Sequence, residues 1–250
     1  TDLRTLVEVA AASGASAVGL NPLHALFPHD PGHASPYSPS SRLLLNVLYL
    51  DPEGIAEFAG CAPARERVGS RAFQDTLRAL RAAELVDYSR VAALKAEVLQ
   101  LLYTDFRERH LGRGTERERA FRDFQRAGGE TLRRSSLFFT LQETLYERDK
   151  AAWGWRTWPQ EYRDPASSAV VQYAGEHADR IAYYDYLQWN ADGQLGAAGR
   201  RALDLHLGVR IYLDLAVGAV PGGAETWGQP GLYADNVNVG CPPDDFGPNG

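Results

Sequence analysis

The sequence predicts an α/β fold in which part of a (β/α)8 TIM barrel is interrupted by a large helical insertion subdomain. Two short apolar runs, residues 15–21 and 209–214, have the composition of strands covered on both faces of a parallel sheet. Most of the chain between them carries apolar residues at the spacing of amphipathic helices. The runs end in Asn21 and Asp214, and such barrels build their sites at the carboxyl ends of the strands. We therefore expect both residues on one functional face.

The first expected unit is a barrel segment over residues 1–52, made of a helix, a strand and a long loop. Asp2 can cap a helix that ends near Gly14, because glycine suits the left-handed conformation common after helices. Pro22 ends the strand that follows. Residues 22–42 contain five prolines and three histidines and are too long for a simple connector. We expect this loop to carry function.

The second expected unit is a mainly helical insertion subdomain over residues 53–205. Asp51 and Pro52 have the residue types of a helix N-cap and first turn, so they predict a helix that runs through Phe58. Three apolar stripes at helical spacing predict three or four packed helices between residues 70 and 148, with Gly112, Gly114, Gly128 and Gly129 as breaks. Further helices are expected at about 176–191 and 197–205.

Trp153, Trp155 and Trp158 crowd into six residues just before Pro159. Such indole rings could stack on sugar rings or fill a junction between subdomains. The sequence leaves both alternatives open, and it favours packing because aromatic side chains serve most often in burial.

The third expected unit, residues 206–250, holds the second strand and the start of another loop. Only two convincing barrel strands occur in the chain, whereas eight are needed to close the sheet. We therefore expect an incomplete barrel within this sequence.

Composition restricts the kind of partner. The 250 residues are 44% hydrophobic and carry a formal net charge of -6, with both signs mixed along the chain, which gives no basic patch for nucleic acid or acidic membranes. No apolar run approaches the roughly 20 residues of a membrane-spanning helix, and no signal-like leader opens the sequence. We expect a cytoplasmic protein with a neutral partner. Cys61 and Cys241 lie far apart and are expected to be free thiols.

Two neighbouring motifs carry a specific resemblance. Residues 19–28, GLNPLHALFP, are followed by SPYSPSSR at residues 35–42 and by Leu45-Asn46. This stretch closely resembles the signature of bacterial amylomaltases, the 4-α-glucanotransferases of glycoside hydrolase family 77, and the match is long and free of gaps. Other segments similar to the family extend the resemblance over nearly the whole chain: 154–159, 186–189, 214–218, 223–227 and 240–244.

The resemblance implies a retaining transfer of α-1,4-glucan segments between malto-oligosaccharides or other α-1,4-glucans, without a metal or organic cofactor. Retaining chemistry needs a carboxylate nucleophile and a carboxylic acid about 5 to 5.5 Å apart. The family carries its nucleophile Asp, its acid/base Glu and a third, stabilising Asp in motifs that do not occur in this sequence. Family order places them beyond Gly250 and the opening barrel strand before Thr1. We therefore expect a fragment that lacks the catalytic residues and is inactive alone.

The resemblance also implies substrate contacts. Ser35 and Tyr37 match positions on the donor side of the site, where a tyrosine ring can stack on a glucose face and its hydroxyl can bond a sugar oxygen. Asp214 matches a buried carboxylate that supports the geometry around the nucleophile. The start of a loop over the acceptor side is matched by Pro243, Asp244 and Phe246.

Some of these residues have other interpretations. Asp214 could be a structural or capping acid at a strand end. Asp244 and Asp245 do not predict a catalytic pair, because adjacent residues rarely converge on one bond. Three loop histidines near an aspartate suggest metal binding, but their spacing fits no defined ligand pattern, so no metal site is predicted. These side chains are His24, His29, His33 and Asp30.

The competing functional hypothesis is a short, non-catalytic module that binds glucans or another protein. It would use the loop over residues 22–42 and the helical insertion. The sequence does not determine the oligomeric state, the preferred glucan length or whether cyclic products form.

Overall fold

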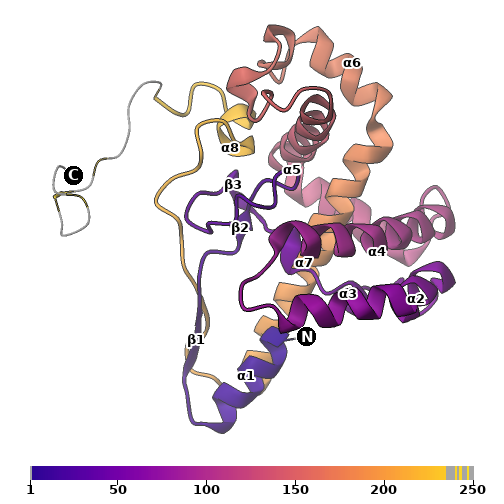
Figure 1. Cartoon of the computed structure of the whole chain (residues 1–250), viewed down its shortest axis with the longest axis vertical. Coiled ribbons are helices and arrows are strands. Elements are labelled where there is room, and N and C mark those ends of the chain that lie inside the picture. Colours follow the sequence, from indigo (N-terminus) through magenta and orange to yellow (C-terminus); the bar gives the residue numbers. More distant parts are fainter. Residues whose placement is uncertain (1, 235–239, 241, 244–246, 248–250) are drawn as a thin grey trace.

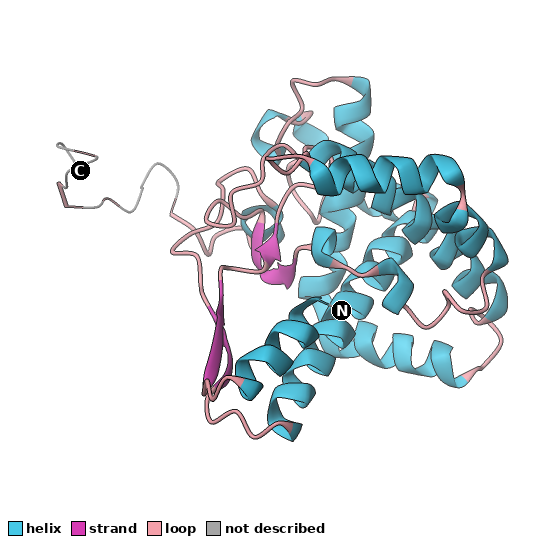
Figure 2. Cartoon of the chain, turned by 60° about the horizontal axis from the view of Figure 1, so that its bottom comes forward, coloured by secondary structure: helices cyan, strands magenta, loops and turns pink. Residues whose placement is uncertain are grey.

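The computed structural model describes residues 2–234, 240, 242, 243 and 247 (Figure 1). Helices make up most of it, and the strands lie along one side (Figure 2). Among the described helices, none is long and apolar enough to cross a membrane. In chain order the helices and strands are α1 (Asp2–Ala12), β1 (Ala17–Leu20), β2 (His24–Ala25), β3 (Ser41–Leu45), α2 (Ala62–Gly69), α3 (Arg71–Ala82), α4 (Tyr88–Arg109), α5 (Glu116–Arg148), α6 (Ser168–Glu176), α7 (Ala178–Asp204), β4 (Arg210–Leu213) and α8 (Ala224–Gly228).

The two strands predicted from apolar runs, β1 and β4, lie side by side and parallel (Figure 1). Ala17 pairs with Arg210 and Leu20 with Leu213, so the carboxyl ends of the two strands are adjacent. This pairing fits the parallel sheet expected of an α/β fold. A small buried cluster joins β1 to α1 and to the end of α7, and it consists of Val7, Val18, Ala202 and Leu207.

The prediction that both faces of these strands are buried is wrong for the described part of the chain. Val18 is buried and Ile211 packs on the small cluster, but Tyr212 is 60% exposed and Leu213 is 47% exposed. Successive side chains of a strand point to opposite faces. The described residues therefore cover the β1–β4 pair on the side of α1 and leave Tyr212 open on the other.

The main core lies among the helices. α5 and α7 pack against each other, and α4 packs on α7 and on the short helices α2 and α3 (Figure 1). Leu50 and Ala25 belong to the same buried cluster, so the segment before the helices shares their core. Cys61 is a buried free thiol in this core, whereas Cys241 lies outside the described residues.

The glycine pairs break the helices where the sequence predicts. Gly112 and Gly114 have φ values of +74° and +65° in the turn between α4 and α5. Gly129 has φ +53° and ψ -141° within α5, where it kinks that long helix. Side chains with a Cβ rarely adopt positive φ, so glycine at these positions determines where the helices turn.

The two helices expected at 176–191 and 197–205 are one continuous helix, α7. Gly193 and Gly196 lie inside it, and each costs about 1 kcal/mol relative to alanine. Side-chain contacts offset this cost. Gln188 bonds both the backbone N and O of Leu45, at 3.0 and 2.8 Å, and Gln194 does the same to Asp51, at 2.9 and 2.8 Å.

The helix predicted from Asp51 through Phe58 does not form. Only a 3-10 turn, η2 (Pro52–Gly54), follows, and the Asp51 side chain makes no cap hydrogen bond to it. The reason is tertiary, because Gln194 of α7 takes the backbone groups of Asp51. A second 3-10 turn precedes it, η1 (Val47–Tyr49), in which Asn46 Oδ1 accepts from Leu48 N at 3.0 Å.

The tryptophan cluster fills a junction. Trp158 is fully buried and stacks on Phe138 of α5, with ring centroids 5.0 Å apart. The indole N–H of Trp153 donates to Asp30 at 2.8 Å, and that of Trp155 donates to Thr226 at 2.9 Å. Each ring thus links the helical part to a loop or to α8, which supports the packing alternative.

Candidate functional site

The strand ends bring together two residues that are far apart in sequence. The hydroxyl of Tyr37 donates to Asp214 Oδ2 at 3.0 Å, and Asp214 Oδ1 accepts from the backbone N of Leu215 at 2.8 Å. Asp214 directly follows β4, and its own backbone N bonds Leu20 O at the end of β1. Tyr37 is 54% exposed, so the phenol and the carboxylate form a polar pair that is open to solvent.

This pair differs in two ways from the sequence-based expectation. Asp214 was expected to be buried, but it is partly exposed at the end of a strand that carries only one covered face. The Tyr37 hydroxyl, expected to meet a sugar oxygen, is engaged by Asp214. That hydrogen bond raises the pKa of Tyr37 above its ordinary value.

The long loop is closed at its base by a short antiparallel pair, which positions Tyr37. β2 pairs with β3, with His24 opposite Leu45 and Ala25 opposite Ser41. The excursion between these strands ends in a turn in which Ser38 N bonds Ser35 O at 3.2 Å. Ser35 is exposed in the same turn as Tyr37.

The acceptor-side residues are less defined. Pro243 is described and exposed, whereas Asp244 and Phe246 lie outside the described residues, as does Asp245.

The ion pair between Arg42 and Glu225 was not predicted as part of the site. Arg42 of β3 meets the carboxylate of Glu225 in α8 with its Nη2 at 2.6 Å and its Nε at 3.1 Å, and the Arg42 backbone N adds a bond of 2.6 Å. Glu225 is only 3% exposed. The Tyr233 hydroxyl also donates to Glu225.

The charge state of this pair follows from its contacts. Burial alone would raise the pKa of Glu225, but the hydrogen bonds from Arg42 and Tyr233 outweigh it and hold the pKa below the ordinary value. The carboxylate is therefore ionised. Both partners lie in segments that carry the family resemblance, but nothing in the sequence indicates that these two segments touch.

His24 holds the backbone beyond Asp214. Its Nε2 accepts a hydrogen bond from the backbone N of Ala216 at 3.2 Å. Burial, and after it the charge of Arg42, lower the pKa of His24, while Glu225 and Asp214 oppose this shift. The neutral ring can accept a hydrogen bond, which fits the observed contact.

The other loop histidines pack against aromatic rings. Phe27 is buried and meets His33 at 5.1 Å, His29 at 5.7 Å and Trp153 at 4.4 Å between ring centroids. Within the part of the chain that the structure describes, no group of three or more His, Cys, Asp or Glu side chains could hold a metal ion. In the described residues, the loop histidines contact aromatic rings and backbone groups.

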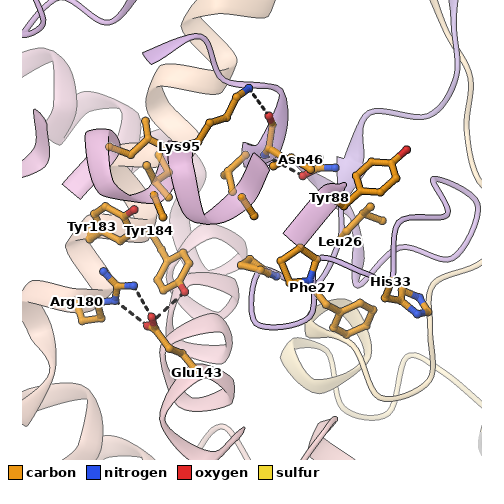
Figure 3. A pocket seen from close by; sticks show the side chains of 18 residues that line it. Leu26, Phe27, His33, Asn46, Tyr88, Lys95, Glu143, Arg180, Tyr183 and Tyr184 are labelled. Atoms are coloured by element: carbon orange, nitrogen blue, oxygen red, sulfur yellow. Dashed lines mark hydrogen bonds and ion pairs between the residues drawn. The ribbon is translucent and has the colours of Figure 1, made fainter. Parts of the chain in front are cut away.

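A recess of about 150 Å³ lies between this loop, η1 and the helices α4, α5 and α7 (Figure 3). Glu143 and Arg180 form an ion pair of 2.5 Å on its wall, and the Arg180 guanidinium lies over the Tyr183 ring at 4.2 Å. Lys95 donates to the backbone O of Leu48 and of Leu50, at 2.7 and 2.8 Å. Most of the residues that line the recess are apolar. Glu143, Arg180 and Lys95 already have protein partners.

Comparison with known proteins identifies the family. The sequence model of the 4-alpha-glucanotransferase family, glycoside hydrolase family 77, matches residues 1–250. The chain is 35% identical to a 4-alpha-glucanotransferase of Haemophilus influenzae over 100% of its own length and 36% of the relative. It is 34% identical to one of Mycobacterium bovis, over 98% of this chain and 33% of the relative. The chain therefore spans about a third of the length of these curated relatives.

Solved structures agree with this assignment. The amylomaltase of Corynebacterium glutamicum superimposes with a TM-score of 0.78 at 30% identity, covering 100% of this chain and 32% of that one. An amylomaltase of Streptococcus agalactiae in complex with acarbose matches with a TM-score of 0.74 over 99% of this chain and 46% of that one, at 17% identity, which supports the fold alone. Because the family match covers the whole chain, the chain belongs to the 4-α-glucanotransferase family, glycoside hydrolase family 77.

Proposed function

We propose that this chain is part of a 4-α-glucanotransferase that moves α-1,4-glucan segments between malto-oligosaccharides by a retaining double displacement. One observation carries the proposal: in a chain of this family, Asp214 lies at the adjacent carboxyl ends of parallel strands and is bonded to the exposed Tyr37 of the long loop. The names of the Haemophilus and Mycobacterium relatives and the acarbose bound to the streptococcal protein support an α-glucan substrate.

The exposed pair has suitable chemistry for a sugar. Asp214 accepts a hydrogen bond from the Tyr37 hydroxyl, which leaves the lone pairs of the phenol oxygen free to accept from a sugar hydroxyl. The half-exposed ring offers an apolar face on which a glucose ring can stack. We assign Ser35 and Tyr37 to the donor side of the site, and Asp214 to a supporting role beside the nucleophile. Pro243, Asp244 and Phe246 are assigned to its acceptor side.

The reacting carboxylates are proposed to come from outside these residues. A retaining mechanism needs a nucleophile and an acid/base about 5 to 5.5 Å apart, and the family motifs that carry them do not occur in residues 1–250. Asp214 then supports the reaction by binding and orienting substrate. The match to a transferase family over the whole chain does not favour a non-catalytic module.

The domain organisation belongs to the same proposal. Residues 1–52 and 206–250 would contribute barrel segments, and residues 53–205 the helical insertion. The parallel β1–β4 pair beside α1 fits part of such a barrel. The cytoplasmic location stays a prediction.

The test measures disproportionation of maltotriose by the full gene product that carries this sequence. We expect glucose and longer glucans from the wild type, and none from residues 1–250 alone. Asp214→Asn should lower kcat/KM roughly 10- to 100-fold, because a hydrogen bond to a charged group contributes roughly 1.5–3 kcal/mol. Tyr37→Phe keeps the ring but removes the hydroxyl that donates to Asp214, so it should lower kcat/KM by a similar factor.

A matched control is Tyr49→Phe, which removes the hydroxyl of an exposed tyrosine in η1. It should leave kcat/KM unchanged. A wild type that binds maltotriose without transferring glucose units, or an Asp214→Asn variant with full activity, would contradict the proposal.

A further inference from the structure

The segment between Asp214 and α8 lacks internal support. Residues 214–223, all of them described, contain no helix or strand. Their local bonds are few, such as Gly223 N to Val220 O at 2.9 Å. Leu215 and Val217 are exposed, so packing does not hold the segment at these positions. Its conformation must therefore depend on contacts from other elements.

Near α8, Trp155 N bonds Gly222 O and Arg156 Nε bonds Pro221 O, both at 3.2 Å. The contacts nearer to Asp214 come from the loop that also carries Tyr37. His24 Nε2 accepts from Ala216 N at 3.2 Å, and Arg42 Nη1 donates to Val217 O at 3.0 Å. Two side chains of the β2–β3 pair thus hold an N–H and a C=O of neighbouring residues, two and three positions after Asp214. Further along, Val220 N bonds Pro39 O at 2.8 Å.

Arg42 can hold this position because its other nitrogens are anchored. Its Nε and Nη2 meet the buried carboxylate of Glu225, while Nη1 alone turns to Val217. Glu225 is in turn placed by Ser40, whose O accepts from Glu225 N at 3.0 Å and whose Oγ accepts from Ala224 N at 2.9 Å. The anchor and the loop are therefore one connected unit.

We propose that His24 and Arg42 are positioning residues of the glucan site, which hold the backbone after Asp214 so that its carboxylate stays opposite the Tyr37 hydroxyl. Their hydrogen bonds reach the peptide groups of Ala216 and Val217, and they act on Asp214 through this backbone. The inference rests on the proposed function, because positioning is measured as transfer activity.

The chemistry of His24 makes the role specific. The ring must be neutral and unprotonated at Nε2 to accept the Ala216 N–H. The charged groups around it are Arg42 on β3, Glu225 on α8 and Asp214 after β4, and with burial they leave its pKa below the ordinary value. Glutamine can offer an oxygen near the Nε2 position, whereas leucine cannot accept a hydrogen bond.

The experiment is a double-mutant cycle in the full gene product, with maltotriose as the probe. His24→Leu and Arg42→Lys should each lower kcat/KM about tenfold in the wild-type background, as expected for one lost hydrogen bond of roughly 1.4 kcal/mol. Lysine keeps a positive charge for the buried Glu225 but lacks the Nη1 donor that reaches Val217 O. His24→Gln should recover most of the loss. In an Asp214→Asn background, the same His24→Leu change should cost less than about twofold.

The outcomes distinguish the positioning role of His24 and Arg42 from the proposed transferase function. Equal losses in both backgrounds would overturn the positioning role, because residues that act only on overall stability give additive effects. If His24→Leu does not fold, Arg42→Lys carries the same cycle, with Arg71→Lys, a change at a 95% exposed arginine in α3, as the matched control that should change nothing. A wild type without transfer activity would refute the proposed function instead.

Discussion

The free energy of unfolding of the protein should depend on pH through His29, which lies in the long loop. The His29 ring packs edge-on against Tyr146 at 4.8 Å and Phe27 at 5.7 Å, and its buried Nε2 has no hydrogen-bond partner among the described residues. Burial lowers the pKa of His29 from the ordinary 6.5 to about 4, and the charge of Asp30 opposes this only in part. The folded protein therefore holds this ring neutral at pH 7.

The size of the effect follows from these two values. They differ by about 2.5, which corresponds to at most about 3.4 kcal/mol at about 1.36 kcal/mol per pKa unit. Between pH 6.5 and 4 the unfolded chain binds the proton and the folded chain does not. The free energy of unfolding should thus fall as the pH drops below 6.5, and the loss should be complete below about pH 4.

The perturbation is His29→Phe, which keeps an aromatic ring against Tyr146 and removes the titratable nitrogen. Urea unfolding at pH 7, 6, 5 and 4, followed by tryptophan fluorescence, should show a smaller acid-side loss in the variant than in the wild type. His33→Phe changes another ring that contacts Phe27 and should leave the acid-side loss in place.

NMR titration of carbon-13-labelled histidines measures the pKa of His29 directly, and the His29→Phe variant assigns its signal. We expect a midpoint near 4. A midpoint near 6.5, or the same acid-side loss of stability in wild type and His29→Phe, would refute the reasoning from burial.

Two further predictions concern packing. Gly223→Ala should destabilise the folded protein by about 1–3 kcal/mol, because the new Cβ would lie 2.5 Å from the backbone O of Ser40. It should also lower transfer activity by displacing α8. An unchanged melting temperature would contradict this prediction. Glu57→Ala should lower the free energy of unfolding, measured in urea, by about 3–5 kcal/mol. The buried Glu57 carboxylate lies 2.6 Å from Arg117 Nε and accepts from the Tyr186 hydroxyl, so its removal leaves both groups without this partner. Exposed Glu53→Ala is its control and should cost under about 0.5 kcal/mol.

Much of the local structure could be predicted because its causes are local. Gly14 has φ +76° after α1, and the glycines at 112, 114 and 129 turn the chain where expected. The apolar runs mark β1 and β4, since composition alone distinguishes them from their surroundings. The motif at residues 19–28 carries the family resemblance, which the match over the whole chain confirms.

The candidate site could be predicted only as a set of residues. The family resemblance assigned both Tyr37 and Asp214 to the substrate site, and the structure joins them by a hydrogen bond of 3.0 Å. Arg42 and Glu225 were not assigned a role, since they are 183 positions apart and no local pattern relates them. Asp244 and Phe246 lie outside the described residues and stay predictions.

The sequence by itself determined the helix-forming stripes, the glycine breaks, the two strands and the family, because these depend on residues close together in the chain. Only the tertiary structure decided where a segment's backbone groups find partners. α7 continues through Gly193 and Gly196, and the helix at Asp51 is lost, because Gln194 bonds the Asp51 backbone. Contacts between distant segments outweigh preferences of about 1 kcal/mol per residue, and they alone place Asp214 beside Tyr37.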